Sequence, residues 1–168
     1  QRADVLCEGE KVVAIGQGLE APAGAEVIDA AGKYVFPGFI DPHVHIYLPF
    51  MGTQTKDTHA TGSQAALVGG TTTYIEMLAP SRQEDLREGY AYWRRLAEGN
   101  SACDYTFHIG VTRFDDATEG VLRDLVADGM TSFKVFLAYA GFFGVTDEEL
   151  YATLRLAKEL GVIVTAHC

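Results

Sequence analysis

The spacing of apolar residues changes near residue 34, and this change divides the chain into two parts. Before it, three short apolar runs at residues 3–9, 11–16 and 25–30 are separated by glycine-rich turns, a pattern typical of hairpins. We therefore predict a small β layer over residues 1–33. From residue 34 onward, β-rich apolar runs alternate with stretches of helical periodicity, which predicts a second part of the α/β class over residues 34–168.

Five apolar runs in the second part are predicted strands. They begin near residues 34, 71, 104, 131 and 162, so they recur about every thirty residues, the size of a βαβ unit. Helices are predicted between them, and the last one has a capping box of Thr146 and Glu149 and a C-terminal glycine, Gly161. This alternation predicts a parallel sheet, either doubly wound or part of a TIM-type (β/α)8 barrel. No G-x-G-x-x-G follows the first strand, and a barrel needs eight strands.

Composition and charge narrow the class of function. The 168 residues are 48% hydrophobic, which is enough for one domain with a sizeable core. A formal net charge of -10 without a basic cluster disfavours nucleic acids and anionic membrane surfaces as partners. The sequence shows neither a secretory signal nor an apolar run of about 20 residues, so we expect a cytoplasmic protein with no membrane partner.

Residues able to bind a metal stand at the ends of three predicted strands. His43 and His45 follow the first strand, and strand alternation puts both imidazoles on one face, where they can bind one ion. Lys134 interrupts an apolar strand, and His167 ends the last one. Each alone has an ordinary explanation: a chance turn, a lysine that snorkels or pairs with a carboxylate, a structural histidine. Their shared place at strand ends, where barrel enzymes have active sites, favours a metal site.

Lys134 could become a metal ligand if burial lowers its pKa. The neutral amine would capture carbon dioxide, and the resulting carbamate is an anion that can bridge two metal ions. His59 and His108 do not stand at strand ends, and we interpret both as structural.

Five stretches of the chain resemble the cyclic amidohydrolases of the amidohydrolase superfamily, and specifically the hydantoinase and dihydropyrimidinase group. They are residues 34–50, 66–77, 104–111, 129–145 and 156–168. The resemblance implies that residues 34–168 are the N-terminal part of a metal-dependent hydrolase barrel and that residues 1–33 belong to a β-sandwich domain. The later strands of the family, with a fourth histidine and an aspartate, would follow Cys168. We therefore expect an N-terminal fragment that is inactive by itself.

The same resemblance implies a site with two Zn²⁺ ions per subunit. His43 and His45 would bind one ion, carboxylated Lys134 would bridge the pair, and His167 would bind the second ion. Tyr139 matches the tyrosine that hydrogen-bonds the substrate carbonyl oxygen, which makes it the catalytic residue of this chain.

The implied reaction is zinc-dependent hydrolysis of hydantoins or dihydropyrimidines to N-carbamoyl amino acids. Tyr47 stands where dihydroorotases usually carry an arginine, and Leu48, Phe50 and Phe143 make the nearby loops apolar. These residues suit a neutral ring with an aliphatic or aromatic substituent, although packing under long loops explains them equally well. The alternatives are another cyclic amidohydrolase, such as an allantoinase or dihydroorotase, and a non-catalytic dihydropyrimidinase-like interaction protein. The family also implies a homo-oligomer, a tetramer or a dimer.

Overall fold

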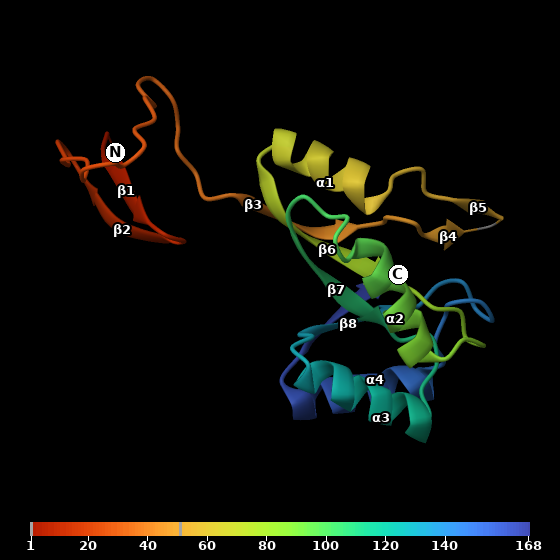
Figure 1. The fold of residues 1–168 in the computed structure, drawn as a ribbon. Coiled ribbons are helices and arrows are strands. Elements are labelled where there is room, and N and C mark those ends of the chain that lie inside the picture. Colours follow the sequence, from red (N-terminus) through yellow and green to blue (C-terminus); the bar gives the residue numbers. More distant parts are fainter. Residues whose placement is uncertain (1, 51) are drawn as a thin grey trace. The chain divides into compact units, whose positions relative to one another are not determined.

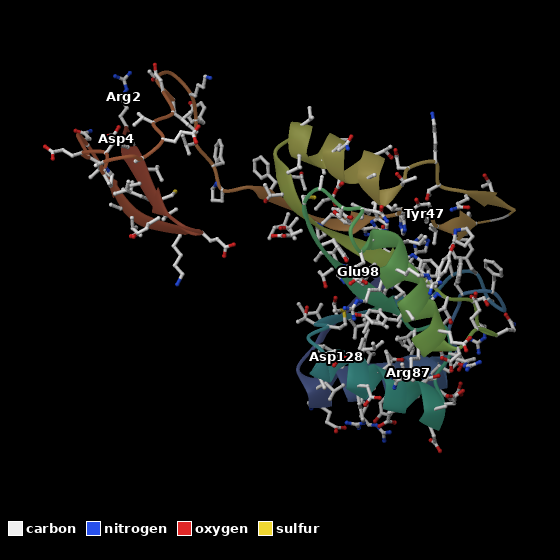
Figure 2. The ribbon with its side chains drawn as sticks, in the orientation of Figure 1. Arg2, Asp4, Tyr47, Arg87, Glu98 and Asp128 are labelled. Atoms are coloured by element: carbon white, nitrogen blue, oxygen red, sulfur yellow. The ribbon has the colours of Figure 1, made fainter. Side chains whose placement is uncertain are left out.

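The computed structural model describes residues 2–50 and 52–168. The described residues divide after Pro37 into two compact units, a first unit of residues 2–37 and a second unit that begins at Gly38. The first unit contains an antiparallel hairpin of β1 (Asp4–Glu8) and β2 (Lys11–Gly16). The Asp4 carboxylate, labelled in Figure 2, accepts the Gly18 N–H at 2.8 Å and so fastens the chain after the hairpin. The apolar run at residues 25–30 is not a strand, contrary to its pattern. That residues 1–33 belong to a β-sandwich stays a prediction.

The first strand of the second unit, β3 (Phe39–Val44), begins at Phe39 and not near residue 34 as the apolar run indicated. Two neighbouring residues explain the difference. Pro37 has no N–H to donate to a strand ladder. Gly38 passes so close to Thr72 that a Cβ atom there would lie 2.0 Å from the threonine hydroxyl oxygen. The chain therefore enters the sheet only after this contact, and the two histidines of the motif lie at the strand end and in the turn that follows.

The second unit is built on one parallel sheet with a simple strand order (Figure 1). Its strands pair in the order β3, β6 (Thr71–Leu78), β7 (Asp104–Gly110), β8 (Ser132–Phe136) and β9 (Ile163–His167). Each new strand joins the same side of the sheet, whereas a doubly wound sheet reverses its order at a switch point. The order therefore confirms the prediction of a partial (β/α)8 barrel and removes the doubly wound alternative.

Four helices connect these strands, and their caps agree with the sequence. They are α1 (His59–Val68), α2 (Leu86–Ala97), α3 (Asp116–Ala127) and α4 (Asp147–Leu160). The capping box of Thr146 and Glu149 is present, and Gly161 closes α4 in the left-handed conformation. A small hairpin of β4 (Pro49–Phe50) and β5 (Thr53–Gln54), which the sequence did not reveal, follows β3. Within the described ranges, no helix is long and apolar enough to cross a membrane.

The main core lies between the sheet and the helices α2, α3 and α4. It includes Ile109, Leu122, Phe133, Val135 and Leu156, all at most 2% exposed. Figure 1 shows α3 and α4 side by side against this face of the sheet, and the two helices are in contact. Since strand neighbours point to opposite faces, Phe133 and Val135 enter the core while Lys134 points to the other side. The face of the sheet that carries Lys134 is therefore the one on which polar side chains can form a site.

The loops that follow β6, β7 and β8 are tied together by Arg82. Its guanidinium donates to the carbonyl oxygens of Thr112 and Gly144 and forms a two-pronged ion pair with Glu149, with Nη2 at 2.7 Å from Oε1. Glu149 also accepts the Thr146 N–H at 2.8 Å. Because both side chains are mostly buried, these charged hydrogen bonds are not diluted by solvent as surface pairs are.

We expect Arg82→Ala to lower the free energy of unfolding by about 2 kcal/mol, since it leaves a buried carboxylate and two carbonyl oxygens without their donor. Arg87 of α2, labelled in Figure 2, pairs with Asp124 on the surface, where both side chains are more than half exposed. Arg87→Ala is the matched control and should cost less than about 1 kcal/mol. Urea unfolding of both variants measures the difference, and equal losses would contradict the role given to Arg82.

Candidate metal centre

His43 and His45 bring two imidazole nitrogens to one point at the end of β3. Their Nε2 atoms are 3.2 Å apart, and the two rings meet at an interplanar angle of 75°. Asp41 accepts the His43 N–H at 3.1 Å and so fixes the backbone at the start of the pair. Two nitrogens bound to a tetrahedral zinc ion at 2.0–2.1 Å would lie about 3.3 Å apart. The pair therefore has the separation of two ligands of one ion.

Lys134 and His167 belong to the same neighbourhood. Lys134 is 3% exposed in the middle of β8, with its Nζ 5.6 Å from the ring centre of Phe136. His167 ends β9 and lies in register with Phe136 on the adjacent strand. Desolvation is the largest cause of the lowered pKa values of His43 and His45, and positive charge on Lys134 or His167 lowers them further, so both residues lie within electrostatic reach of the histidine pair.

Partial desolvation favours the neutral form of three of these groups. It is the largest cause of the lowered pKa of His43 and of His45; nearby positive charges add to it, and Asp41 opposes it at His43. Burial likewise lowers the pKa of Lys134. Neutral imidazole is the form that binds a metal, and a neutral amine is the form that reacts with carbon dioxide.

The side chains at this centre can hold a metal ion only if Lys134 supplies one of the ligands. Across residues 2–50 and 52–168, no three side chains of His, Cys, Asp or Glu gather closely enough to hold an ion. Two imidazoles with a carbamate on Lys134 would give zinc three protein ligands of the kinds that it prefers. Such a set of ligands needs two imidazole nitrogens close together, and those of His43 and His45 are 3.2 Å apart. It also needs a lysine whose pKa is lowered, as that of Lys134 is.

Tyr139 lies at the rim of this centre in an unusual backbone conformation. Its φ is +63°, which is rare for a residue with a side chain. Its carbonyl accepts the N–H groups of Phe142 and Gly144, each at 3.0 Å, so a tight turn holds this conformation. The phenol ring lies 5.3 Å from the ring of His167 and 5.4 Å from that of Phe50. Strained residues held this way are often functional, and here the turn holds the phenol ring beside the ring of His167.

Comparison with known families agrees with this geometry. The pattern of the family described as "Amidohydrolase family" matches residues 34–168, which include all four candidate ligands. The chain belongs to the amidohydrolase family.

Proteins similar to this chain include hydantoinases and dihydropyrimidinases. A D-hydantoinase of Geobacillus stearothermophilus is 45% identical over 98% of this chain and 35% of its own length. A dihydropyrimidinase of Rattus norvegicus is 41% identical over 99% of this chain and 33% of its own length. A solved structure of a D-hydantoinase (dihydropyrimidinase) from Thermus sp. is 71% identical, with a TM-score of 0.94, over 99% of this chain and 36% of that one. The chain thus spans about a third of the length of these relatives.

The apolar residues predicted to line a substrate pocket form a cluster beside Tyr139. Phe143 is 3% exposed and packs on Phe136, with ring centres 5.2 Å apart. Leu48 and Phe50 are half-buried and pack against the same cluster. Phe143 therefore lies under the surface as support, whereas Leu48 and Phe50 reach solvent.

Tyr47 turns away from this cluster in the amidohydrolase fold. Tyr47, which Figure 2 labels, has a φ of +57°. Its ring lies 5.7 Å from that of His59 at the start of α1. His59 is fully buried and its Nδ1 is 2.8 Å from the Tyr74 hydroxyl, consistent with a structural role. Tyr47 thus anchors the loop after β3 to the first helix.

Two buried polar residues near the centre were not among the predicted site residues. Glu76 in β6 is fully buried, accepts the Ile46 N–H at 2.8 Å, and has its pKa raised by burial to about 8. His108 in β7 was interpreted as structural, and its Nε2 atom lies 2.9 Å from the carbonyl oxygen of Pro42. Glu76 could have been found from the sequence, because it is a charged residue inside the apolar run of β6.

Proposed function

We propose that the intact protein hydrolyses the ring amide bond of hydantoins or dihydropyrimidines and releases N-carbamoyl amino acids. The observation that carries the proposal is the pair of Nε2 atoms of His43 and His45, 3.2 Å apart beside a buried Lys134. Similarity to hydantoinases and dihydropyrimidinases over 98–99% of the chain supports this class of substrate. The N-carbamoyl product follows from breaking the ring amide bond of such a substrate.

Four residues of this chain would hold the metal ions. His43 and His45 would bind one zinc, carboxylated Lys134 would bridge two, and His167 would bind the second. When bound, zinc lowers the pKa of water enough to make it a nucleophile at neutral pH. Burial lowers the pKa of Lys134, which favours the neutral amine that a carbamate needs, and desolvation lowers the pKa of His43, which favours the neutral imidazole that binds a metal.

Tyr139 would act on the substrate itself. Its hydroxyl would donate a hydrogen bond to the ring carbonyl oxygen as negative charge develops there. The oxygen of water would then bond to the carbonyl carbon, the ring C–N bond would break, and a proton from the same water would pass to the leaving nitrogen. Leu48 and Phe50, which reach solvent beside Tyr139, would contact the substituent of the ring, with Phe143 beneath them. Residence in the cytoplasm and assembly into dimers or tetramers stay predictions.

The test uses the intact protein, with hydantoin and dihydrouracil as substrates and metal analysis by mass spectrometry. We expect the purified protein to contain zinc and to need His43 and His45 to retain it. We also expect it to open the ring of the substrate, which is measured as a decrease in ultraviolet absorbance. A protein with less than about one zinc per subunit and no ring opening would instead be a non-catalytic interaction protein. The double variant His43→Ala, His45→Ala is the control, since it removes both nitrogens of the pair.

A further inference from the structure

The two-histidine segment is poorly held by the strand ladder that should fix it. The register between β3 and β6 shifts between Asp41 and Val44, which pair with Tyr74 and Glu76. Pro42 also lacks an N–H and cannot donate to a ladder. The main chain around His43 therefore needs support from other groups if the two imidazoles are to keep their separation.

That support comes from one buried side chain on each side of the pair. His108 Nε2 lies 2.9 Å from the carbonyl oxygen of Pro42, the residue before His43. Glu76 Oε2 accepts the N–H of Ile46, the residue after His45, at 2.8 Å. The segment is thus fastened at both ends by side chains from β7 and β6.

The chemistry of each contact fixes its direction. The Pro42 carbonyl can only accept, so His108 must carry its proton on Nε2. Its Nδ1 then accepts from the Ser132 hydroxyl, whose oxygen is 2.5 Å away. Ser132 lies on β8, two residues before Lys134, so the ring of His108 links the histidine strand to the lysine strand.

The burial of Glu76 destabilises the fold. It is fully buried, and its second oxygen, Oε1, has no hydrogen-bond partner among residues 2–50 and 52–168. A buried polar atom without a partner costs stability, whereas an apolar residue of similar size would pack there at no such cost. The bond from the Ile46 N–H is the contact that ties this buried carboxyl group to the two-histidine segment.

We propose that Glu76 and His108 are positioning residues that hold His43 and His45 at ligand separation before a metal arrives. The proposal rests on the proposed function, because it assumes that the two histidines bind metal. Groups behind metal ligands that fix their orientation commonly change metal affinity by 10-fold to 100-fold when they are removed. Neither residue needs to contact the metal or the substrate for this effect.

The test compares apolar and conservative replacements in the intact protein. Glu76→Leu and His108→Leu remove the hydrogen bonds, whereas Glu76→Gln keeps an acceptor oxygen and His108→Gln keeps an N–H donor. Zinc affinity is measured by competition with a chelator, and the visible spectrum of the cobalt-loaded protein reports ligand geometry. His59→Leu is the matched control, because it removes a buried histidine that bonds to Tyr74 and not to residues 42–46.

We expect both leucine variants to bind zinc about 10-fold to 100-fold more weakly with an altered cobalt spectrum, while both glutamine variants stay close to wild type. His59→Leu should lose stability and keep its zinc affinity. Wild-type affinity in folded leucine variants would overturn the inference and leave the proposed function standing. So would glutamine variants as weak as the leucine ones. A wild-type protein that binds no zinc would overturn the proposed function, and the inference with it.

A second measurement covers the case in which a leucine variant does not fold. Hydrogen exchange at the Ile46 amide should be slow in the metal-free wild type and in Glu76→Gln, since both offer an acceptor in a buried place. Rapid exchange in the wild type would show that the contact does not hold the segment and would overturn the inference.

Discussion

Replacing Lys134 with alanine is expected to lower kcat/KM for ring opening by about a thousandfold or more, roughly 4 kcal/mol of transition-state stabilisation. The lysine is 3% exposed on β8, and its lowered pKa leaves an amine that can become a carbamate. Alanine removes the ligand that would bridge the two metal ions, so zinc content should fall along with activity. Steady-state kinetics and metal analysis of the intact protein measure both effects.

Chemical rescue separates a ligand from a structural lysine. Acetate or propionate can enter the space that the lysine side chain leaves and supply a carboxylate, so we expect partial recovery of activity and of zinc binding in Lys134→Ala. Lys158→Ala, on the exposed side of α4, is the control and should behave as wild type without added acid. If zinc content stays unchanged and acids restore nothing, Lys134 is a structural residue.

Glu76→Gln is expected to remove a large pH dependence of stability. Burial raises the pKa of Glu76 from 4.5 to about 8, against opposing hydrogen bonds from Ile46 and Met77. Between these two pH values the folded protein binds more protons at this site than the unfolded chain does. The free energy of unfolding of the wild type should therefore fall by roughly 3 kcal/mol from pH 5 to pH 8 through this group alone.

Urea unfolding at pH 5 and pH 8 measures the effect, with a chelator present because metal binding has a pH dependence of its own. Glu76→Gln should lose much less stability across this interval than the wild type does. Tyr74, on the same face of β6, has its pKa raised to about 12 and stays neutral throughout. Glu20→Gln, at an exposed carboxylate, should keep the wild-type slope. Equal slopes for the wild type and Glu76→Gln would contradict the raised pKa.

Much of the barrel could be predicted because its strands leave a regular trace in the sequence. Apolar runs every thirty residues gave the parallel strands, and the capping box at Thr146 marked the start of α4. The start of β3 was misplaced because the run from residue 34 is apolar throughout, and apolarity alone does not reveal the close contact between Gly38 and Thr72. The run at residues 25–30 failed as a strand although its own unit contains the β1–β2 hairpin: Val27 and Ile28 are exposed, and the run pairs with neither strand.

The candidate site was predictable where a residue type is itself the signal. Lys134 and Glu76 interrupt apolar strands in the same manner, yet only the lysine matched a known family role. Glu76 and His108 bond to the main chain of Ile46 and Pro42, and a backbone partner leaves no mark in the sequence. The same holds for the left-handed conformation of Tyr139, which the turn imposes.

The uninterrupted strand order from β3 to β9 also sets the order of events while the chain is being synthesised. Each strand pairs with one that left the ribosome about thirty residues earlier, so the sheet can grow through contacts of short sequence separation. The metal centre cannot be assembled in this stepwise way, because His43 comes from the first strand of the sheet and His167 from the last. A nascent chain therefore carries the His43–His45 pair, and then Lys134, well before His167 is made.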